Sequence, residues 1–172
     1  SLGSAKIALV EQSGSGNTRK SMKILDAMGL QNKAIVDLDY VFKTAMTNGM
    51  IKENDTDCIQ CKEILSEISA EVGFDLGDDG WPKSSSTMTA SDAFFALAKN
   101  EKAAKHISSL HEKMKTKGIW LWTKGCIEHH LGLEGKSEKA WSEFAQRIID
   151  NEPEEVIADF VFVKGCLDWI KE

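Results

Sequence analysis

Three short apolar runs mark the chain, over Lys6–Val10, Ala34–Val36 and Ile119–Trp122. Each run is continuous rather than alternating and is bounded by polar residues, which is typical of strands buried on both faces of a parallel sheet. Between the first two runs, apolar residues at helical spacing follow Thr18 and stop at Gly29. The pattern therefore predicts a strand, a helix capped by Thr18 and a second strand, which together form a right-handed βαβ unit.

The segment between the second and third runs, about 41–115, is expected to be mainly helical, because apolar residues recur there at the spacing of one helix face. The expected helices run from Val41 to Met46, from Cys58 to Val72, from a cap at Ser91 or Asp92 through Ala98, and from Ile107 to Met114. Residues 73–90 are rich in Gly, Ser, Thr and Asp and contain Pro82. They are expected to form a loop.

The carboxyl-terminal part of the chain is expected to be helical as well. A helix that carries Trp141 and Phe144 follows a loop at 132–137. In the tail, over 156–170, the apolar residues alternate spacings of four and three, which favours a helix. The short run Phe160–Val163 could instead be a strand, and both alternatives stay open.

Composition narrows the class of protein. With 172 residues, of which 42% are hydrophobic, the chain can form one domain with a sizeable core. No apolar run is long enough to span a bilayer and no signal peptide opens the chain, so we expect a cytoplasmic protein that does not contact membranes. The four Cys are accordingly expected to be free thiols. Residues 1–4 could be an expression scar, and they are left out of the fold prediction.

The charge balance is acidic, since 21 Lys and Arg against 27 Asp and Glu give a net charge of −6. Only Arg19 and Arg147 are arginines. Such a chain does not bind nucleic acid through its overall electrostatic field. If it acts on DNA, its acidic clusters must hold cations, or another domain must supply the basic surface.

Carboxylates follow the three predicted strands. Glu11 comes directly after the first strand, Asp37 and Asp39 come after the second, and Glu128 lies six residues beyond the third. Ligands of open parallel sheets bind outside the carboxyl ends of the strands, where we expect these acids to converge. Converging carboxylates repel one another unless cations lie between them, and hard oxygen ligands suit Mg²⁺ or Mn²⁺. On an extended strand, Asp37 and Asp39 would point to the same face. A single Asp at a strand end needs no such role, so the metal-site hypothesis depends on the combination.

Two segments carry a family resemblance: Asp37-Leu-Asp-Tyr-Val-Phe42 and Trp120-Leu-Trp-Thr-Lys-Gly-Cys-Ile-Glu128-His-His-Leu. Together with Glu11 after a first strand, they resemble the Toprim domain, a catalytic module of topoisomerases, bacterial primases and the OLD-family nucleases (overcoming lysogenization defect). The Gly-x-x-Glu element after a late strand is most similar to the OLD branch. The resemblance runs from about Lys6 to Ile148. It implies an α/β fold with a Rossmann-like Toprim core, a parallel sheet and a helical insertion at about 41–117, within a domain over 5–172.

The resemblance also implies metal ligands. Glu11 and Asp37 match the family's ligands, and Asp39 matches the second acid of the Asp-x-Asp pair. Glu128 matches the late acid at a second metal. Asp92 is a weaker match, with an ordinary helix N-cap as its alternative.

The implied activity is cleavage of DNA phosphodiesters, as an endonuclease or nickase, with two Mg²⁺ or Mn²⁺ ions at the site. The family uses a Lys near the scissile phosphate, for which Lys136 is the first match and Lys124 the second. In the OLD family this domain usually follows an ABC-type ATPase domain, and this sequence contains no Gly-x-x-x-x-Gly-Lys-Ser/Thr loop. The chain departs from the pattern at Gln12 and Ser15, where most Toprim domains have Gly and often an acid. One metal is therefore expected to have fewer carboxylate ligands.

The segment after the first predicted strand also fits a different class of protein. Ser13-Gly-Ser-Gly-Asn-Thr18, between a strand and a helix, resembles the phosphate loop of flavodoxins, in which N–H groups at a helix start hold FMN. Glu11 would place a negative charge beside that phosphate. An FMN-binding electron carrier also leaves Asp37, Asp39 and Glu128 unexplained. A non-catalytic Toprim domain that only binds partners is a further alternative.

The Cys, His and Trp residues are less informative. Cys58 and Cys61 have the spacing of half a zinc site, but they fall within a helical pattern without a second pair, so buried thiols are expected. His129 and His130 follow the late acid and are interpreted as bystanders. Trp81, in the polar loop, is the one Trp considered for base stacking, and the other Trp residues are mostly assigned to the core.

Overall fold

The structure is a computed structural model of the chain, and it describes residues 6–12, 14–85 and 88–172. The chain divides into two compact units. The larger unit comprises Ser15–Cys126, and the smaller unit combines Ser1–Gly14 with Ile127–Glu172. Each unit is described by itself.

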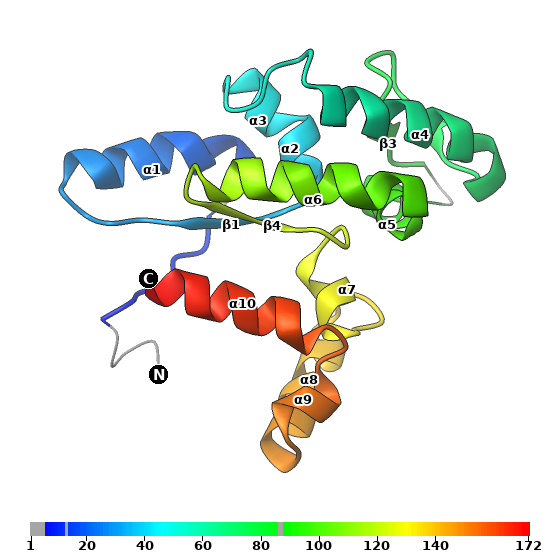
Figure 1. The fold of residues 1–172 in the computed structure, drawn as a ribbon. Helices are drawn as coiled ribbons and strands as arrows, with labels where there is room; N and C mark the ends of the chain where they lie inside the picture. Colours follow the sequence, from blue (N-terminus) through cyan, green and yellow to red (C-terminus); the bar gives the residue numbers. More distant parts are fainter. Residues whose placement is uncertain (1–5, 13, 86–87) are drawn as a thin grey trace. The chain divides into compact units, whose positions relative to one another are not determined.

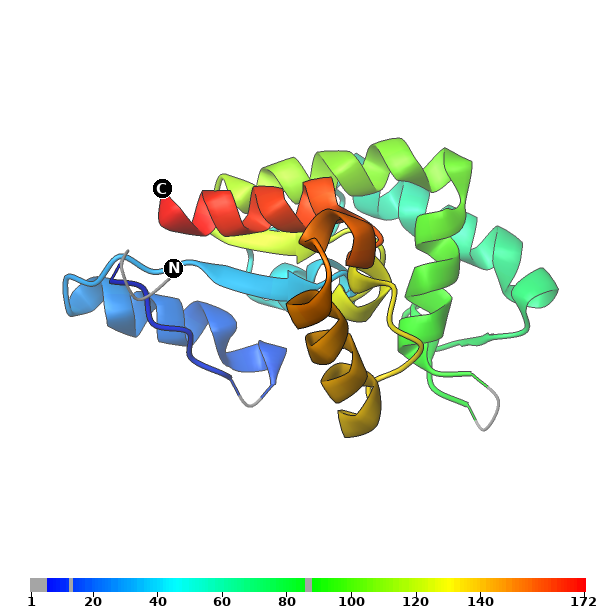
Figure 2. The same cartoon turned by 90° about the horizontal axis from the view of Figure 1, so that it is seen from below.

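Two parallel strands form the main sheet of the larger unit: β1, Ala34–Asp37, and β4, Ile119–Trp122. Ala34 lies opposite Ile119 and Asp37 lies opposite Trp122, so both strands end at the same edge. Figure 2 shows the two strands side by side. All four residues of β4 are buried, as its continuous apolar run predicted. The predicted α/β class with a parallel sheet is confirmed, and this sheet is compatible with a Rossmann-like core.

The chain between β1 and β4 is mainly helical, as predicted. The larger unit contains η1 Ser15–Asn17, α1 Thr18–Ala27, α2 Asp39–Phe42, α3 Thr44–Thr47, α4 Thr56–Val72, α5 Ala90–Lys99 and α6 Glu101–Lys115. A short antiparallel hairpin, β2 Asp75–Leu76 with β3 Pro82–Lys83, lies within the segment predicted to be a loop. Helix α6 packs against β4 and against both α4 and α5 (Figure 1). Helix α6 therefore joins the helical layer to the sheet. The predicted boundaries of the domain, 5–172, and of the helical insertion, about 41–117, stay predictions.

Polar caps fix where the two longest helices begin. Asp55 accepts hydrogen bonds from the N–H groups of Asp57 and Cys58 and so caps α4. Asn100 caps α6 in the same way, through the N–H group of Lys102. Both helices then bury an apolar face, which provides most of their stability.

Two local predictions about the larger unit are wrong. The helix predicted over Val41–Met46 is divided between α2 and α3 at Lys43, whose φ of −111° and ψ of −71° depart from helical values. Thr18 does not cap α1, because its hydroxyl donates to the carbonyl of Ser15 at 2.8 Å. The residue before the helix is Asn17, which makes no side-chain cap bond.

Four helices make up the described part of the smaller unit after residue 126: α7 Ile127–Leu131, α8 Glu138–Asp150, α9 Pro153–Val156 and α10 Phe160–Lys171. Helix α10 packs against α7. Its buried residues Val163, Cys166 and Trp169 recur at three-residue spacing, while Val161 faces solvent. The helical interpretation of the tail is therefore confirmed from Phe160 onward, whereas residues 157–159 are not helical and separate α9 from α10. The alternative strand over Phe160–Val163 is wrong.

The strand predicted over Lys6–Val10 is also wrong. The segment forms no strand, and the side chains of Leu9 and Val10 are 69% and 82% exposed. A strand requires a hydrogen-bonded neighbour, and a run of apolar residues does not specify one. The predicted βαβ unit is therefore replaced by the parallel pair of β1 and β4, which the helices from α2 to α6 connect.

Candidate functional site

The late acidic element folds into a turn followed by a short helix. Gly125 follows β4 with a φ of 99°, a conformation that favours glycine. Its carbonyl accepts a hydrogen bond from the N–H group of Leu38 at 2.8 Å. Two residues later the chain enters α7, of which Glu128 is the second residue. The Gly-x-x-Glu spacing is thus the length needed to leave the strand and start this helix.

Glu128 is a buried acid with an unsatisfied oxygen. Its side chain is 10% exposed, and its Oε2 atom has no hydrogen-bond partner among the described residues. The Nζ atom of Lys136 lies 4.0 Å from Oε2, which makes an ion pair but is too long for a hydrogen bond. A buried polar atom without a partner typically costs about 1–3 kcal/mol, and more when it is charged. Oε2 is therefore placed to accept a donor or a cation that the described residues do not supply.

Lys136 reaches Glu128 from the loop before α8. Gly135 turns the chain there with a φ of 107°, and Ser137 then caps α8 by accepting from the N–H group of Ala140 at 3.2 Å. The Lys136 side chain is 58% exposed, so its amine can reach both solvent and the acid. This loop places the first-choice Lys beside the late acid, while its role in a reaction stays a prediction.

His130 anchors the helix that carries Glu128. Its ring is fully buried, and a carboxylate can only accept, so Nδ1 donates to Oδ2 of Asp159 at 2.9 Å. The N–H group of Asp159 donates back to the carbonyl of His130 at 2.9 Å. The imidazole also stacks on the ring of Phe162, with centroids 4.5 Å apart. The interpretation of His130 as a bystander missed this anchor, because its partners lie about thirty residues along the chain.

Asp37 and Asp39 lie at the carboxyl edge of the sheet in the larger unit. Asp37 is the last residue of β1, and Asp39 is the first residue of α2. Leu38, between them, has helical dihedral angles of −60° and −33°. The two acids therefore do not continue along an extended strand, and the argument that alternation places them on one face is wrong. Both side chains are partly buried at the edge of the sheet.

The other sequence-predicted residues have different surroundings. Glu11 lies in an exposed, irregular segment of the smaller unit, and Lys124 is exposed in the turn after β4. Asp92 takes part in a capping box: its Oδ2 accepts from the N–H group and the hydroxyl of Thr89, at 2.9 and 2.6 Å, and Thr89 caps α5. The helix cap therefore lies at Thr89 rather than at Ser91 or Asp92. The capping box gives Asp92 a structural role, and its metal role stays a prediction.

Glu128 and Lys136 are brought together within the smaller unit, whereas Asp37 and Asp39 lie in the larger one. The prediction that these acids and Glu11 share one cleft concerns both units and stays a prediction. Across residues 6–12, 14–85 and 88–172, no group of three or more His, Cys, Asp or Glu side chains is arranged to hold a metal ion. Among the described residues of the smaller unit, Glu128 has a buried oxygen without a hydrogen-bond partner, and its role as a metal ligand stays a prediction.

A second polar cluster links α4 to α6 in the larger unit. Oδ1 of Asp57 accepts from Nδ1 of His106 at 2.7 Å, and Oδ2 accepts from the hydroxyl of Ser109 at 2.6 Å. The amine of Lys113 donates to Oδ2 of Asp57 at 2.8 Å and to both oxygens of Asp55. Partial burial raises the pKa of Asp57, but the hydrogen bonds from Lys113, Ser109 and His106 outweigh it and lower the pKa to about 2. Every partner in this cluster is supplied by the fold, which is the mark of a structural network.

The cysteines behave as core residues. Cys58 and Cys61 lie on the buried face of α4, and Cys126 and Cys166 are buried as well. Burial raises the pKa of the thiols of Cys58, Cys61 and Cys166 to about 12, so they are protonated at neutral pH. The prediction of buried free thiols is confirmed.

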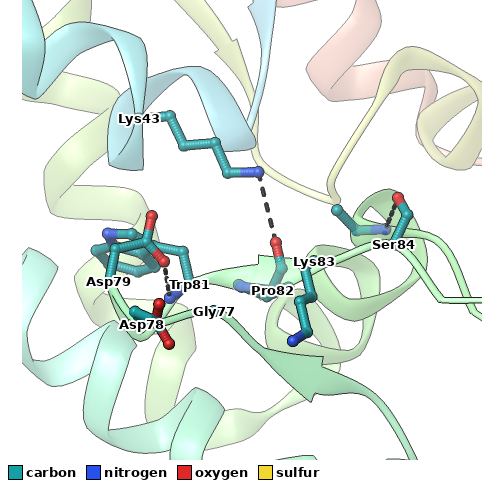
Figure 3. Close-up of a pocket in the computed structure, with 9 residues that line it drawn as sticks. Lys43, Gly77, Asp78, Asp79, Trp81, Pro82, Lys83 and Ser84 are labelled. Atoms are coloured by element: carbon teal, nitrogen blue, oxygen red, sulfur yellow. Dashed lines mark hydrogen bonds between the residues drawn. The ribbon is translucent and has the colours of Figure 1, made fainter.

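An open pocket of about 500 Å³ lies beside the β2–β3 hairpin (Figure 3). Lys43 reaches across it to the carbonyl of Pro82 at 3.5 Å, and Asp79 accepts from the N–H group of Trp81 at 3.0 Å. Trp81 is buried and stacks on Phe42 at 4.7 Å, so its ring belongs to the core and is not presented for base stacking. The lining contains two lysines and two aspartates, so the formal charges around the opening cancel, and the pocket does not present the basic surface that binds a nucleic-acid backbone.

Comparison with known proteins finds a similarity to an OLD nuclease. The chain is 25% identical, over 174 residues, to the Old nuclease of Escherichia phage P2. The match covers 98% of this chain and 29% of that nuclease, so the chain spans less than a third of its relative's length. No protein-family model and no solved structure matches the chain.

The relation does not favour the flavodoxin alternative. In the described part of that motif, Gly14 lies in a bend, Ser15–Asn17 form the 3-10 helix η1 and Thr18 begins α1, whereas Ser13 lies outside the described residues. In the described part of the chain, no helix has the length and apolar character needed to cross a membrane.

Proposed function

We propose that this chain is the Toprim nuclease part of an OLD-type protein and cleaves DNA phosphodiesters with divalent metal ions. The unsatisfied, buried Oε2 of Glu128 carries the proposal, because Glu128 stands at the Gly-x-x-Glu position for which the family resemblance implies a metal ligand. The similarity to a nuclease over 98% of the chain supports the same activity. A carboxylate kept from water without a donor is costly, and a bound cation removes that cost.

The ligand chemistry fits Mg²⁺ or Mn²⁺. The proposed ligands are Glu11, Asp37, Asp39 and Glu128, all carboxylates, which are the hard oxygen donors that these ions prefer. Glu128 supplies an oxygen without a protein partner, and Asp37 lies at the carboxyl end of a strand. Two ions would be held per site. When bound, they lower the pKa of a coordinated water and neutralise charge on the scissile phosphate.

The chain's own residues would then bind and orient the phosphodiester. Lys136, whose ammonium pairs with Glu128 at 4.0 Å, would turn toward a non-bridging phosphate oxygen and stabilise the negative charge that develops there. Lys124 is the fallback, since it is exposed just beyond the end of β4.

The negative net charge of the chain indicates that DNA binding requires a further contact. At −6 the chain repels a polyanion, so bound cations or a second domain must attract the substrate. Because the chain spans 29% of the nuclease it resembles, we propose that an ABC-type ATPase domain, in the same chain or in a partner, supplies this contact. The expected location is the cytoplasm.

Nicking of supercoiled plasmid tests the proposal. We expect nicking with Mn²⁺ or Mg²⁺, its loss on addition of EDTA, and its loss in Glu128→Gln. Lys139→Ala serves as the control, since Lys139 pairs with Glu143 on the exposed face of α8. Metal-independent nicking, or full activity in Glu128→Gln, contradicts the proposed site. If the purified protein is yellow, binds FMN and does not nick plasmid, the flavodoxin-like alternative is favoured instead.

A further inference from the structure

Helix α7, which presents Glu128, is too short to hold itself in place. It contains five residues, and isolated helices shorter than about 12–15 residues are marginal in water. Its backbone continues into a tight turn, in which the N–H group of Leu133 donates to the carbonyl of Glu128 at 2.9 Å. The direction of the Glu128 side chain therefore depends on what packs against α7.

The segment that starts α10 supplies that support. Asp159 makes two hydrogen bonds to His130, one from each direction, and Phe162 stacks on its ring. The backbone approaches closely at the end of α7, where a Cβ atom added to Gly132 would lie 2.9 Å from the Cβ of Ala158. Gly132 also has a φ of 78°, so both space and backbone require glycine there.

We propose that His130, held by Asp159 and Phe162, is a positioning residue that sets the Glu128 carboxylate for metal binding. His130 and Glu128 lie in the same five-residue helix, so the anchor at His130 fixes the backbone from which the Glu128 side chain projects. Glu128 has no hydrogen bond at Oε2 to hold its direction, and the Lys136 amine at 4.0 Å is a loose constraint. The inference rests on the proposed function, since it names what orients the proposed ligand.

A buried histidine can also serve stability alone, and two variants separate these roles. His130→Phe keeps a flat ring over Phe162 and removes the Nδ1 donor. Asp159→Ala removes the acceptor at a position that is 23% exposed, so it leaves the buried ring in place and is the variant more certain to fold. Asp159→Asn keeps an oxygen that accepts from Nδ1 and should rescue. Phe144→Leu, in the core of α8, is the control for a loss of stability elsewhere in the same unit.

The direct readout is Mn²⁺ binding to the full chain by titration calorimetry, below the melting temperature of each variant. Partners that orient a metal ligand are typically worth about 10–100-fold in metal affinity. We expect a loss of that size in His130→Phe and Asp159→Ala, a loss under about threefold in Asp159→Asn, and parental affinity in Phe144→Leu at a matched loss of stability. The Mn²⁺ concentration for half-maximal nicking should rise in parallel.

Two failures are distinguishable. If the parental chain binds and cleaves with Mn²⁺ and folded Asp159→Ala or His130→Phe binds Mn²⁺ equally well, the positioning role is overturned while the nuclease remains. The positioning role is also overturned if Phe144→Leu loses affinity to the same extent, because the effect then follows stability. If the parental chain neither binds Mn²⁺ nor nicks plasmid, the proposed function fails, and the inference fails with it.

Discussion

Asp57 and Glu128 are both acids withdrawn from solvent, and they lie in different units of the chain. The Asp57 side chain is 17% exposed, and its two oxygens accept from an imidazole, a hydroxyl and an ammonium. The Glu128 side chain is 10% exposed, and its Oε2 accepts nothing from the described residues. The fold supplies hydrogen-bond donors to both carboxylate oxygens of Asp57, whereas the described residues supply none to Oε2 of Glu128.

The difference shows how a structural acid is told from a candidate ligand. Burial alone does not separate the two side chains. What separates them is whether the polar partners needed to offset desolvation are built into the protein. The same contrast predicts opposite results when each carboxylate is replaced by its amide.

The largest expected effect is on activity in Glu128→Gln. Its nicking rate should fall by roughly a thousandfold, the upper end of what one charge-stabilising group contributes. The metal-free protein should be as stable as the parent or more stable, because the change removes a buried charge that the exposed Lys136 amine, at 4.0 Å, compensates only in part. Single-turnover nicking at saturating Mn²⁺ and thermal unfolding in EDTA measure the two quantities. A large loss of stability at parental activity would make Glu128 a structural acid like Asp57.

A smaller effect on rate is expected for Lys136→Ala. We expect a loss of roughly a hundredfold in the single-turnover rate, the lower end of such contributions, because the amine is exposed. DNA affinity should change little, since the group acts on the chemical step. Lys124→Ala is the comparison. If Lys124→Ala is inactive and Lys136→Ala nicks at the parental rate, the two roles are reversed, and if both are fully active, neither Lys takes part.

Asp57→Asn should show the opposite pattern from Glu128→Gln. The change removes charge-assisted hydrogen bonds from a satisfied network, so the free energy of unfolding should fall by about 1.5–3 kcal/mol. Nicking and Mn²⁺ affinity of the folded protein should stay parental. Urea unfolding measures the loss, and Lys102→Ala is the control, since the exposed pair of Lys102 and Glu67 is worth at most about 1 kcal/mol. Unchanged stability in Asp57→Asn would contradict the structural role that the comparison gives to Asp57.

The acid dependence of stability sharpens the same contrast. The pKa of Asp57 is lowered from 3.8 to about 2, so its charged form is favoured by folding. The stabilisation from this group is therefore present above pH 3.8 and is lost as the pH falls toward 2. The unfolding free energies of the parent and of Asp57→Asn, measured between pH 6 and 2, should converge over that interval. Parallel curves would mean that Asp57 titrates alike in the folded and unfolded chain.

The sequence predicted best where periodicity and burial coincide. The apolar run Ile119–Trp122 became a fully buried strand, and the spacing over Cys58–Val72 became α4, Thr56–Val72. Over Lys6–Val10 the same kind of run gave no strand, because apolar character reports a tendency to be buried and does not name a pairing partner. The break at Lys43 likewise depends on packing that a pattern of residue types does not encode.

The candidate site was predictable only in part, for a related reason. Glu128 was identified from the local element Gly-x-x-Glu, which needs only a few neighbouring residues. The anchor between His130 and Asp159 joins residues 29 positions apart, and the link from His106 to Asp57 joins residues 49 apart. Such pairs leave no local pattern, because each side chain alone is an ordinary polar residue of a helix or loop.

The central claim is that Glu128 is a metal ligand and that Asp57 is not. The Mn²⁺-induced shift in melting temperature tests this claim most directly. In the parent, Mn²⁺ at about a hundred times its dissociation constant should add about 2.7 kcal/mol, a rise of roughly 5–10 °C for a chain of this size. The account predicts that Asp57→Asn begins from a lower melting temperature and keeps the full shift. It predicts that Glu128→Gln begins from the parental temperature or above and loses most of the shift. A full shift in Glu128→Gln, or its loss in Asp57→Asn, would contradict the account.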